Sequence, residues 1–170
     1  MLHLVLLILF GLALILMEGS FSSLAVRPNL PLIIAVYSGQ FYPPMAGLII
    51  SFILGYFLDL TSGSLVGQNT FSLVSLSYLS SLLGNRMVIQ NRITQVIVIF
   101  ISCMAYSSII YLLFGFFNIA VSGYAYIKTS LWDGLITAII SPVLISVIKK
   151  MERFFRFENE RASSDGNIKV

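Results

Sequence analysis

The main deficit in this sequence is charge. Only 10% of its 170 residues are charged, whereas a soluble domain carries about 25%, and 58% are hydrophobic. Ten of the seventeen charged residues follow Ile148, so the preceding part of the chain is almost uncharged. We therefore expect an all-α polytopic membrane protein, a transmembrane helical bundle with about six spans.

The groups that most catalytic and metal sites use are also scarce. His3 is the only histidine. Cys103 lies in an apolar segment, and because it is the only cysteine, an intrachain disulfide and a cysteine-cluster metal site are excluded. The sequence has no His-Glu pair at metal spacing, no glycine-rich phosphate loop with a lysine, and no carboxylate dyad. We predict no catalytic residue, no metal and no cofactor.

The surplus of basic residues gives a net charge of +3 and a pI near 9.1. Lys149, Lys150, Arg153 and Arg156 directly follow a hydrophobic run, where anionic lipid attracts each basic group by about 1 kcal/mol. This placement favours a bilayer surface as the partner and argues against nucleic acid. A docking site for a cytoplasmic protein is the alternative for this segment.

Six apolar segments are candidates for crossing the bilayer, which requires about 20 helical residues. They are Leu2–Met17, Asn29–Phe41, Met45–Leu60, Gly67–Leu83, Ile93–Phe117 and Leu131–Ile148. The second is doubtful because prolines confine a regular helix to about two-thirds of that length. It is expected to be short, tilted or irregular, and five spans remain if it does not cross.

Positive charge between the spans predicts the orientation, because Lys and Arg in short loops favour the cytoplasmic side. Arg86 and Arg92 precede the fifth span and the basic tail follows the sixth, so both clusters can be cytoplasmic. Arg27 and Lys128 would then lie outside. The first span has no basic n-region and no convincing cleavage site, so we expect it to be retained.

The positions of the apolar segments divide the chain into a transmembrane domain and a tail. Residues 1–148 form a transmembrane domain, and residues 149–170 form a basic cytoplasmic tail that is disordered from Ser163 to Val170. Ser130 and Asp133 have the spacing of a capping box, which predicts that they open the last span. Pro142 is expected to kink that span.

The most informative stretch joins the third span to the fourth. Gly55 and Asp59 are one helical turn apart and share a face, so Gly55 permits a close helix approach. Asp59 is placed to accept hydrogen bonds from amides of the following turn, where Ser62, Gly63 and Gly67 supply turn-forming residues. A capped helix end and a partner-binding site are both compatible with this pattern.

A second stretch, Arg27-Pro28-Asn29, places a cation and a stiff turn at the entrance to the short second span. This turn, followed by the Gly-x-x-x-Asp-x-x-Ser-Gly-x-x-x-Gly pattern from Gly55 to Gly67, resembles the rod shape-determining protein MreD family. The chain length, the span pattern and the basic C-terminus are also similar, so the resemblance covers most of the chain. Beyond Leu83 it depends on hydropathy, with Pro142 as the main landmark.

The resemblance implies a noncatalytic subunit of the bacterial cell-elongation machinery in the cytoplasmic (inner) membrane. Members associate with MreC, a bitopic protein with a large periplasmic part, and through it with the filament MreB, with RodA and with a penicillin-binding transpeptidase. They regulate peptidoglycan synthesis and rod shape. The family fold is similar to the substrate-binding components of energy-coupling-factor vitamin transporters.

One hypothesis is that the helices pack against the transmembrane helix of MreC. Small residues would supply the close contacts and weak hydrogen bonds, about 0.6 kcal/mol each, that drive helix association in lipid. They are concentrated in the fourth span, at Ser72, Ser75, Ser77, Ser80, Ser81 and Gly84. The alternative is that these residues pack only within their own chain.

The rival function is a vitamin-binding membrane component of an energy-coupling-factor transporter. It requires a pocket on which several polar groups converge. The candidates are Gln40, Tyr42, Gln68, Asn69 and Asn118. A membrane assembly factor unrelated to either function is a third possibility.

Overall fold

The chain is all-helical over the residues that the computed structural model describes, which are 2–20, 28–63, 65–84, 92–117 and 122–166. Six helices follow one another along it: α1 (Leu2–Ser20), α2 (Leu30–Phe41), α3 (Pro44–Ser62), α4 (Gln68–Gly84), α5 (Arg92–Phe116) and α6 (Gly123–Gly166). The first five agree with the predicted segments to within a few residues. A helical membrane bundle is therefore confirmed as the fold class.

The short helix α2 is the centre of the fold. Its residues from Pro31 to Gly39 are all buried, and α1, α3, α4, α5 and α6 all contact it. The other five helices thus enclose it, as is typical of a core helix that is apolar on every side. With 12 residues it is about 18 Å long, well short of a hydrocarbon core of about 30 Å. The predicted shortness of this segment is confirmed.

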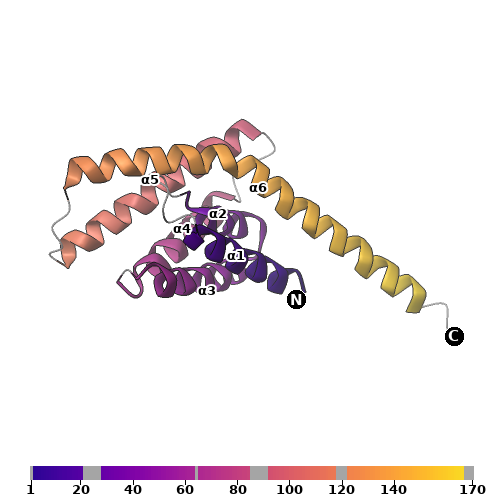
Figure 1. Ribbon diagram of the computed structural model, residues 1–170. Coiled ribbons are helices and arrows are strands. Elements are labelled where there is room, and N and C mark those ends of the chain that lie inside the picture. Colours follow the sequence, from indigo (N-terminus) through magenta and orange to yellow (C-terminus); the bar gives the residue numbers. More distant parts are fainter. Residues whose placement is uncertain (1, 21–27, 64, 85–91, 118–121, 167–170) are drawn as a thin grey trace.

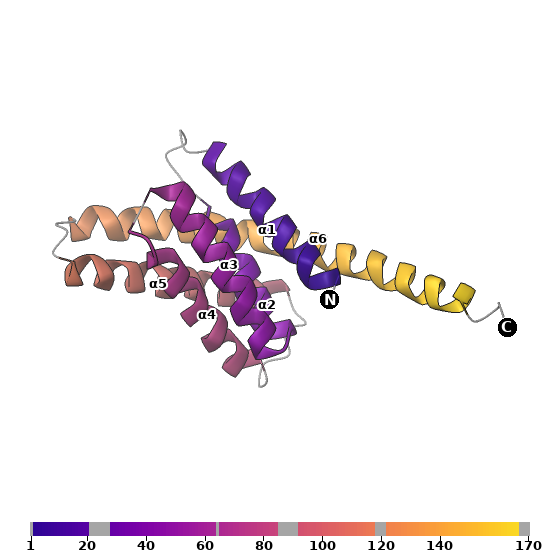
Figure 2. The ribbon, with the colours of Figure 1, turned by 90° about the horizontal axis from the view of Figure 1, so that it is seen from below.

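The remaining helices form two groups (Figures 1 and 2). Helices α1, α3 and α4 lie around α2, whereas α5 and α6 run side by side as a long hairpin. Within the described ranges, three helices are long and apolar enough to cross a membrane: Pro44–Ser62, Ile93–Phe116 and Gly123–Arg153. The described parts of α1 and α2 are apolar but shorter.

Helix α6 begins at Gly123 and not at Leu131, so the predicted capping box is wrong. Ser130 and Asp133 lie inside the helix, because its first two turns pack on α5. There the Tyr126 hydroxyl donates to the Ser107 carbonyl oxygen at 3.0 Å, and the Tyr126 ring lies 5.5 Å from the ring of Tyr111. The predicted span began at Leu131 because several residues in those two turns are polar.

The same helix extends past Ile148 to Gly166 and projects away from the bundle in both views (Figures 1 and 2). The predicted disorder from Ser163 to Val170 stays a prediction, and residues 167–170 lie outside the described part. Pro142 lies inside the uninterrupted helix.

Candidate functional site

Asp59, the acid singled out in the sequence, is 1% exposed and caps the helix that follows it. Its Oδ1 accepts from the amide of Asn69 at 2.9 Å. Its Oδ2 accepts from the amides of Gly67 at 2.9 Å and Thr70 at 3.1 Å, and from the Thr70 hydroxyl at 2.6 Å. A carboxylate at a helix N-terminus satisfies amides that have no partner in the helix. The last turn of α3 is thereby fixed to the first turn of α4.

The glycines of this motif have distinct geometric roles. A Cβ on Gly55 would lie 2.9 Å from the Thr70 amide nitrogen and still closer to the Thr70 Cα, so only glycine permits this approach of α3 to α4. Gly63 ends α3 with φ 62° and Gly67 precedes α4 with φ 97°. Both are left-handed conformations that glycine adopts without steric cost.

Ser62 and Asn69 extend this network toward α5. The Asn69 side-chain amide donates to the Ser62 hydroxyl at 3.3 Å, and its carbonyl oxygen accepts from the hydroxyl of Tyr106. The motif is thus connected to a helix that begins more than twenty residues later.

Asn29, from the second motif, also has two roles. Its side-chain oxygen accepts from the Leu32 amide at 3.2 Å and so caps α2. Its own amide donates to the Thr137 hydroxyl of α6 at 3.0 Å. Pro28 precedes it in the turn, and Arg27 lies outside the described residues.

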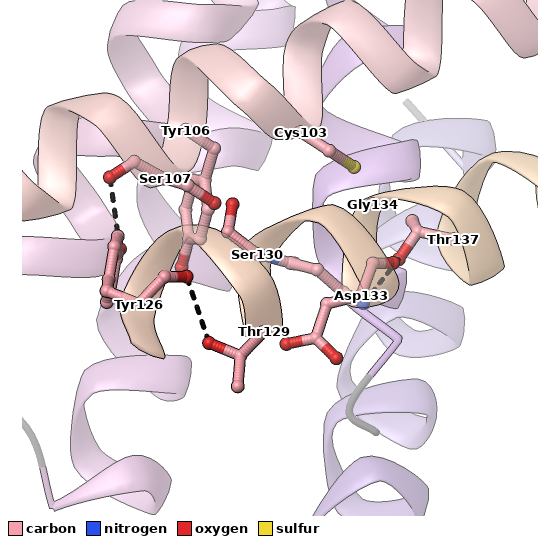
Figure 3. Close-up of a pocket in the computed structure, with 10 residues that line it drawn as sticks. Cys103, Tyr106, Ser107, Tyr126, Thr129, Ser130, Asp133, Gly134 and Thr137 are labelled. Carbon is pink, nitrogen blue, oxygen red and sulfur yellow. Dashed lines mark hydrogen bonds between the residues drawn. The ribbon is translucent and has the colours of Figure 1, made fainter. Parts of the chain in front are cut away.

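Asn29 and Tyr106, the partner of Asn69, both line a polar pocket between α5 and α6 (Figure 3). The pocket has a volume of about 150 Å³, and the start of α2 also reaches it. Its lining residues are Asn29, Cys103, Tyr106, Ser107, Tyr126, Thr129, Ser130, Asp133, Gly134 and Thr137. Ser130 points toward α5, whereas the Asp133 carboxylate lies on the same side of α6 as Thr129.

A separate polar cluster lies at the opposite end of α2. Tyr37 and Tyr42 donate their hydroxyls to the two carboxylate oxygens of Glu152, at 2.9 Å and 2.5 Å. The Lys149 ammonium lies 5.1 Å from the centre of the Phe41 ring. Burial and the hydrogen bond to Glu152 raise the pKa of Tyr42, which lies between α2 and α3. These contacts attach the basic end of α6 to the central helix.

The serines of α4 face the interior of the chain. Ser72, Ser77, Ser80 and Ser81 are all buried, so the hypothesis that this surface packs on a partner helix is wrong for these four. Ser72 and Ser81 donate to carbonyl oxygens of their own helix. Because α2 and α3 cover this face, the small volume of serine serves packing within the chain.

The polar candidates for a vitamin site do not converge. Tyr42 lies at the C-terminal end of α2 beside Glu152, and Gln40 lines a small cavity in the same region. Gln68 and Asn69 lie at the start of α4, beside the Asp59 cap. Asn118 lies outside the described residues.

Close helix packing was only partly recognised in the sequence. Gly47, Ser51 and Gly55 recur at four-residue spacing on the buried face of α3, a small-residue pattern typical of membrane helix contacts. Gly47 packs on Gly39 of α2, where a Cβ on Gly47 would lie 3.1 Å from the Gly39 Cα. Gly39 in turn packs on the backbone of Ser77. The four-residue spacing could have revealed Gly47.

Among the described residues, no group of three or more His, Cys, Asp or Glu side chains is placed to hold a metal ion. A model of the family described as rod shape-determining protein MreD matches residues 1–151, which include both motifs. No curated protein and no solved structure matches the chain.

Proposed function

Because the chain belongs to the MreD family of rod shape-determining proteins, we propose that it binds MreC and helps regulate peptidoglycan synthesis during cell elongation. Its family gives it a role in rod shape determination, and its long apolar helices make it an integral membrane protein. It acts without catalysis, in the inner membrane, with a cytoplasmic C-terminus. Its links to MreB, RodA and a penicillin-binding transpeptidase pass through MreC.

The observation that supports an MreC site most directly is the row of exposed apolar side chains on the outer face of α3. Met45, Ile49, Phe52, Tyr56 and Leu60 recur every three or four residues along this helix, and all five are exposed. They form one continuous apolar stripe with two aromatic rings. We assign this stripe to the single transmembrane helix of MreC, which it can contact along about four turns.

The motif residues support this face without touching the partner. Gly55 sets the distance between α3 and α4, and Asp59 holds the end of α3 against the start of α4. A surface that is fixed before binding loses less conformational entropy when it binds. In this proposal Ser62, Gly63 and Gly67 shape the connecting turn. Pro28 and Asn29 orient the start of α2 at the same end of the bundle, and Arg27 of the same motif lies outside the described residues.

Copurification from mild detergent tests the proposal. The wild-type chain should recover MreC, and the double variant Phe52→Ala, Tyr56→Ala should recover about tenfold less, because it removes both aromatic rings of the stripe and with them packing contacts of the kind that drive helix association in lipid. The matched control is Ile139→Ala, Val143→Ala, which truncates two exposed side chains of α6 and should leave recovery unchanged.

Size-exclusion profiles of all three proteins establish that they fold alike. The proposed site is wrong if both double variants lose MreC equally. The proposed function is wrong if the wild-type chain recovers no MreC, and recovery of an ATPase pair with a transmembrane coupling protein would establish the transport function instead.

A further inference from the structure

The charged residues at the basic end of α6 point in different directions. Glu152 accepts hydrogen bonds from two tyrosine hydroxyls, and the Lys149 ammonium lies over an aromatic ring of α2, so both are engaged within the chain. Lys150 and Arg153 are exposed instead. Residues three apart on a helix are neighbours on its surface. The outer side of α6 therefore carries two adjacent cations.

An apolar groove on the same side of α6 leads to Lys150. It has a volume of about 370 Å³, and its lining residues are Pro142, Val143, Ser146, Val147 and Lys150. They recur every three or four positions, so they share one side of the helix. Val143 and Val147 are exposed. Since all five residues belong to α6, the groove opens away from the rest of the bundle.

We propose that this surface binds one anionic phospholipid, of the phosphatidylglycerol class. The lipid phosphate lies between Lys150 and Arg153, and one hydrocarbon chain follows the groove past Val147 toward Pro142. This is a defined site and not a general attraction of the basic segment to the bilayer, because Lys149 has a packing role and takes no part in it. The site does not depend on the function proposed above.

The change from apolar to basic residues matches the two parts of a lipid. Val147 and Lys150 are about 4.5 Å apart along the helix axis. The stems of Lys and Arg lie along apolar surface while their charged ends extend toward the headgroups. A chain in the groove thus brings its phosphate to an ammonium and a guanidinium group. Both form charge-assisted hydrogen bonds with phosphate oxygens.

The dimensions of the groove argue against a partner helix as its occupant. From Pro142 to Lys150 the groove extends about 12 Å along the axis, so its volume corresponds to a cross-section of about 30 Å². A helix with its side chains is about 10 Å across, which gives a cross-section of about 80 Å². The Ser146 hydroxyl, which could link two helices, donates to the Pro142 carbonyl oxygen of its own helix at 2.6 Å. One hydrocarbon chain fits this space and requires no hydrogen bond.

Charge selects an anionic headgroup over a zwitterionic one. No acidic residue lines the groove among the residues that the structure describes, and the carboxylate of Glu152 is engaged by the two tyrosines. Phosphatidylcholine also offers a phosphate, but its quaternary ammonium would lie near Lys150 and Arg153 and be repelled by them. Phosphatidylglycerol has no such cation.

Native mass spectrometry of the full chain, purified in detergent and titrated with defined lipids, tests the proposal. Phosphatidylglycerol should bind about tenfold more tightly than phosphatidylcholine, because two basic groups act on one anionic headgroup. The double variant Lys150→Gln, Arg153→Gln should reduce this preference to less than about twofold.

Lys149→Gln is the matched control for Lys150→Gln. It removes the same charge from the neighbouring residue, on the side that faces Phe41. It should lower the preference by less than about twofold, whereas Lys150→Gln alone should lower it by about threefold. Size-exclusion profiles establish that the variants fold alike.

Two further arms test the groove and the source of the phosphate. Val147→Phe fills the groove without a change in charge and should weaken phosphatidylglycerol binding. Glycerophosphoglycerol, which has the headgroup without chains, should not displace the lipid. A photoreactive amino acid at Val143 should capture lipid in cells.

Equal binding of the two lipids by the wild-type chain would overturn the proposal. Equal losses in Lys149→Gln and Lys150→Gln would do so as well, because only the total charge of the segment would then matter. Unchanged binding in Val147→Phe, or displacement by glycerophosphoglycerol at equal concentration, would contradict a lipid held by its chain. Capture of a protein at Val143 would assign the groove to a partner helix.

Discussion

Asp59 shows how a single side chain joins two helices. Three backbone amides and one hydroxyl at the start of α4 donate to its carboxylate, and the residue is almost wholly buried. Asn69, whose amide is one of these donors, also accepts a hydrogen bond from the Tyr106 hydroxyl of α5 through its side-chain oxygen. Removal of the carboxylate would therefore leave several buried donors without an acceptor.

We predict that Asp59→Ala lowers the free energy of unfolding by about 2–4 kcal/mol, since each unsatisfied buried donor costs about 1–3 kcal/mol and relaxation recovers part of it. Asp133→Ala, in the partly exposed pocket, should cost less. Unfolding in a mixed-detergent titration measures both. Equal and negligible effects of the two substitutions would remove Asp59 from the structural core.

The sequence predicted the local part of this site and not the distant part. Eight to eleven residues separate Asp59 from its donors, so spacing and turn-forming residues were sufficient to predict the cap. Tyr106 lies 37 residues from Asn69, and Thr137 lies 108 residues from Asn29. Nothing in the local pattern marks such pairs, because they depend on how whole helices pack.

At the scale of helices, the lengths of the apolar segments predicted most helix boundaries, but they did not predict which side of each helix faces the interior. The prolines around α2 correctly indicated a short helix. The start of α6 was missed because Tyr126 and its neighbours are too polar for an apolar span, although they pack well on α5. The orientation of α4 could not be read from the sequence, since serines and apolar residues alternate around it without a clear polar face.

The packing of α3 on α4 leads to a second stability prediction. Gly55→Ala should lower the free energy of unfolding by about 1–3 kcal/mol, because the added methyl group meets the backbone of Thr70 and forces the helices apart. The matched control is Gly115→Ala on α5, where a Cβ would meet nothing within 4 Å.

At Gly115 the change should be neutral or stabilising by at most about 1 kcal/mol, the difference in helix propensity. The same detergent unfolding assay compares the two variants. A loss at Gly115 as large as that at Gly55 would mean that both changes act through the helix itself and not through the contact of α3 with α4.

In the whole molecule, polar residues gather at two ends of a central apolar helix. The Asp59 cap, Asn29 and the pocket between α5 and α6 lie at the end where α2 begins. Tyr37, Tyr42 and Glu152 lie where it ends, next to the basic part of α6. A cytoplasmic C-terminus, as proposed, would place the Asp59 cap, Asn29 and the pocket on the outer side of the membrane.

The central claim is that the outer face of α3 contacts the transmembrane helix of MreC, and photocrosslinking in growing cells measures this contact directly. A photoreactive amino acid at Phe52 should give a covalent adduct with MreC, whereas the same amino acid at Ile139, an equally lipid-accessible position on α6, should not. An adduct from Ile139 without one from Phe52 would contradict the account.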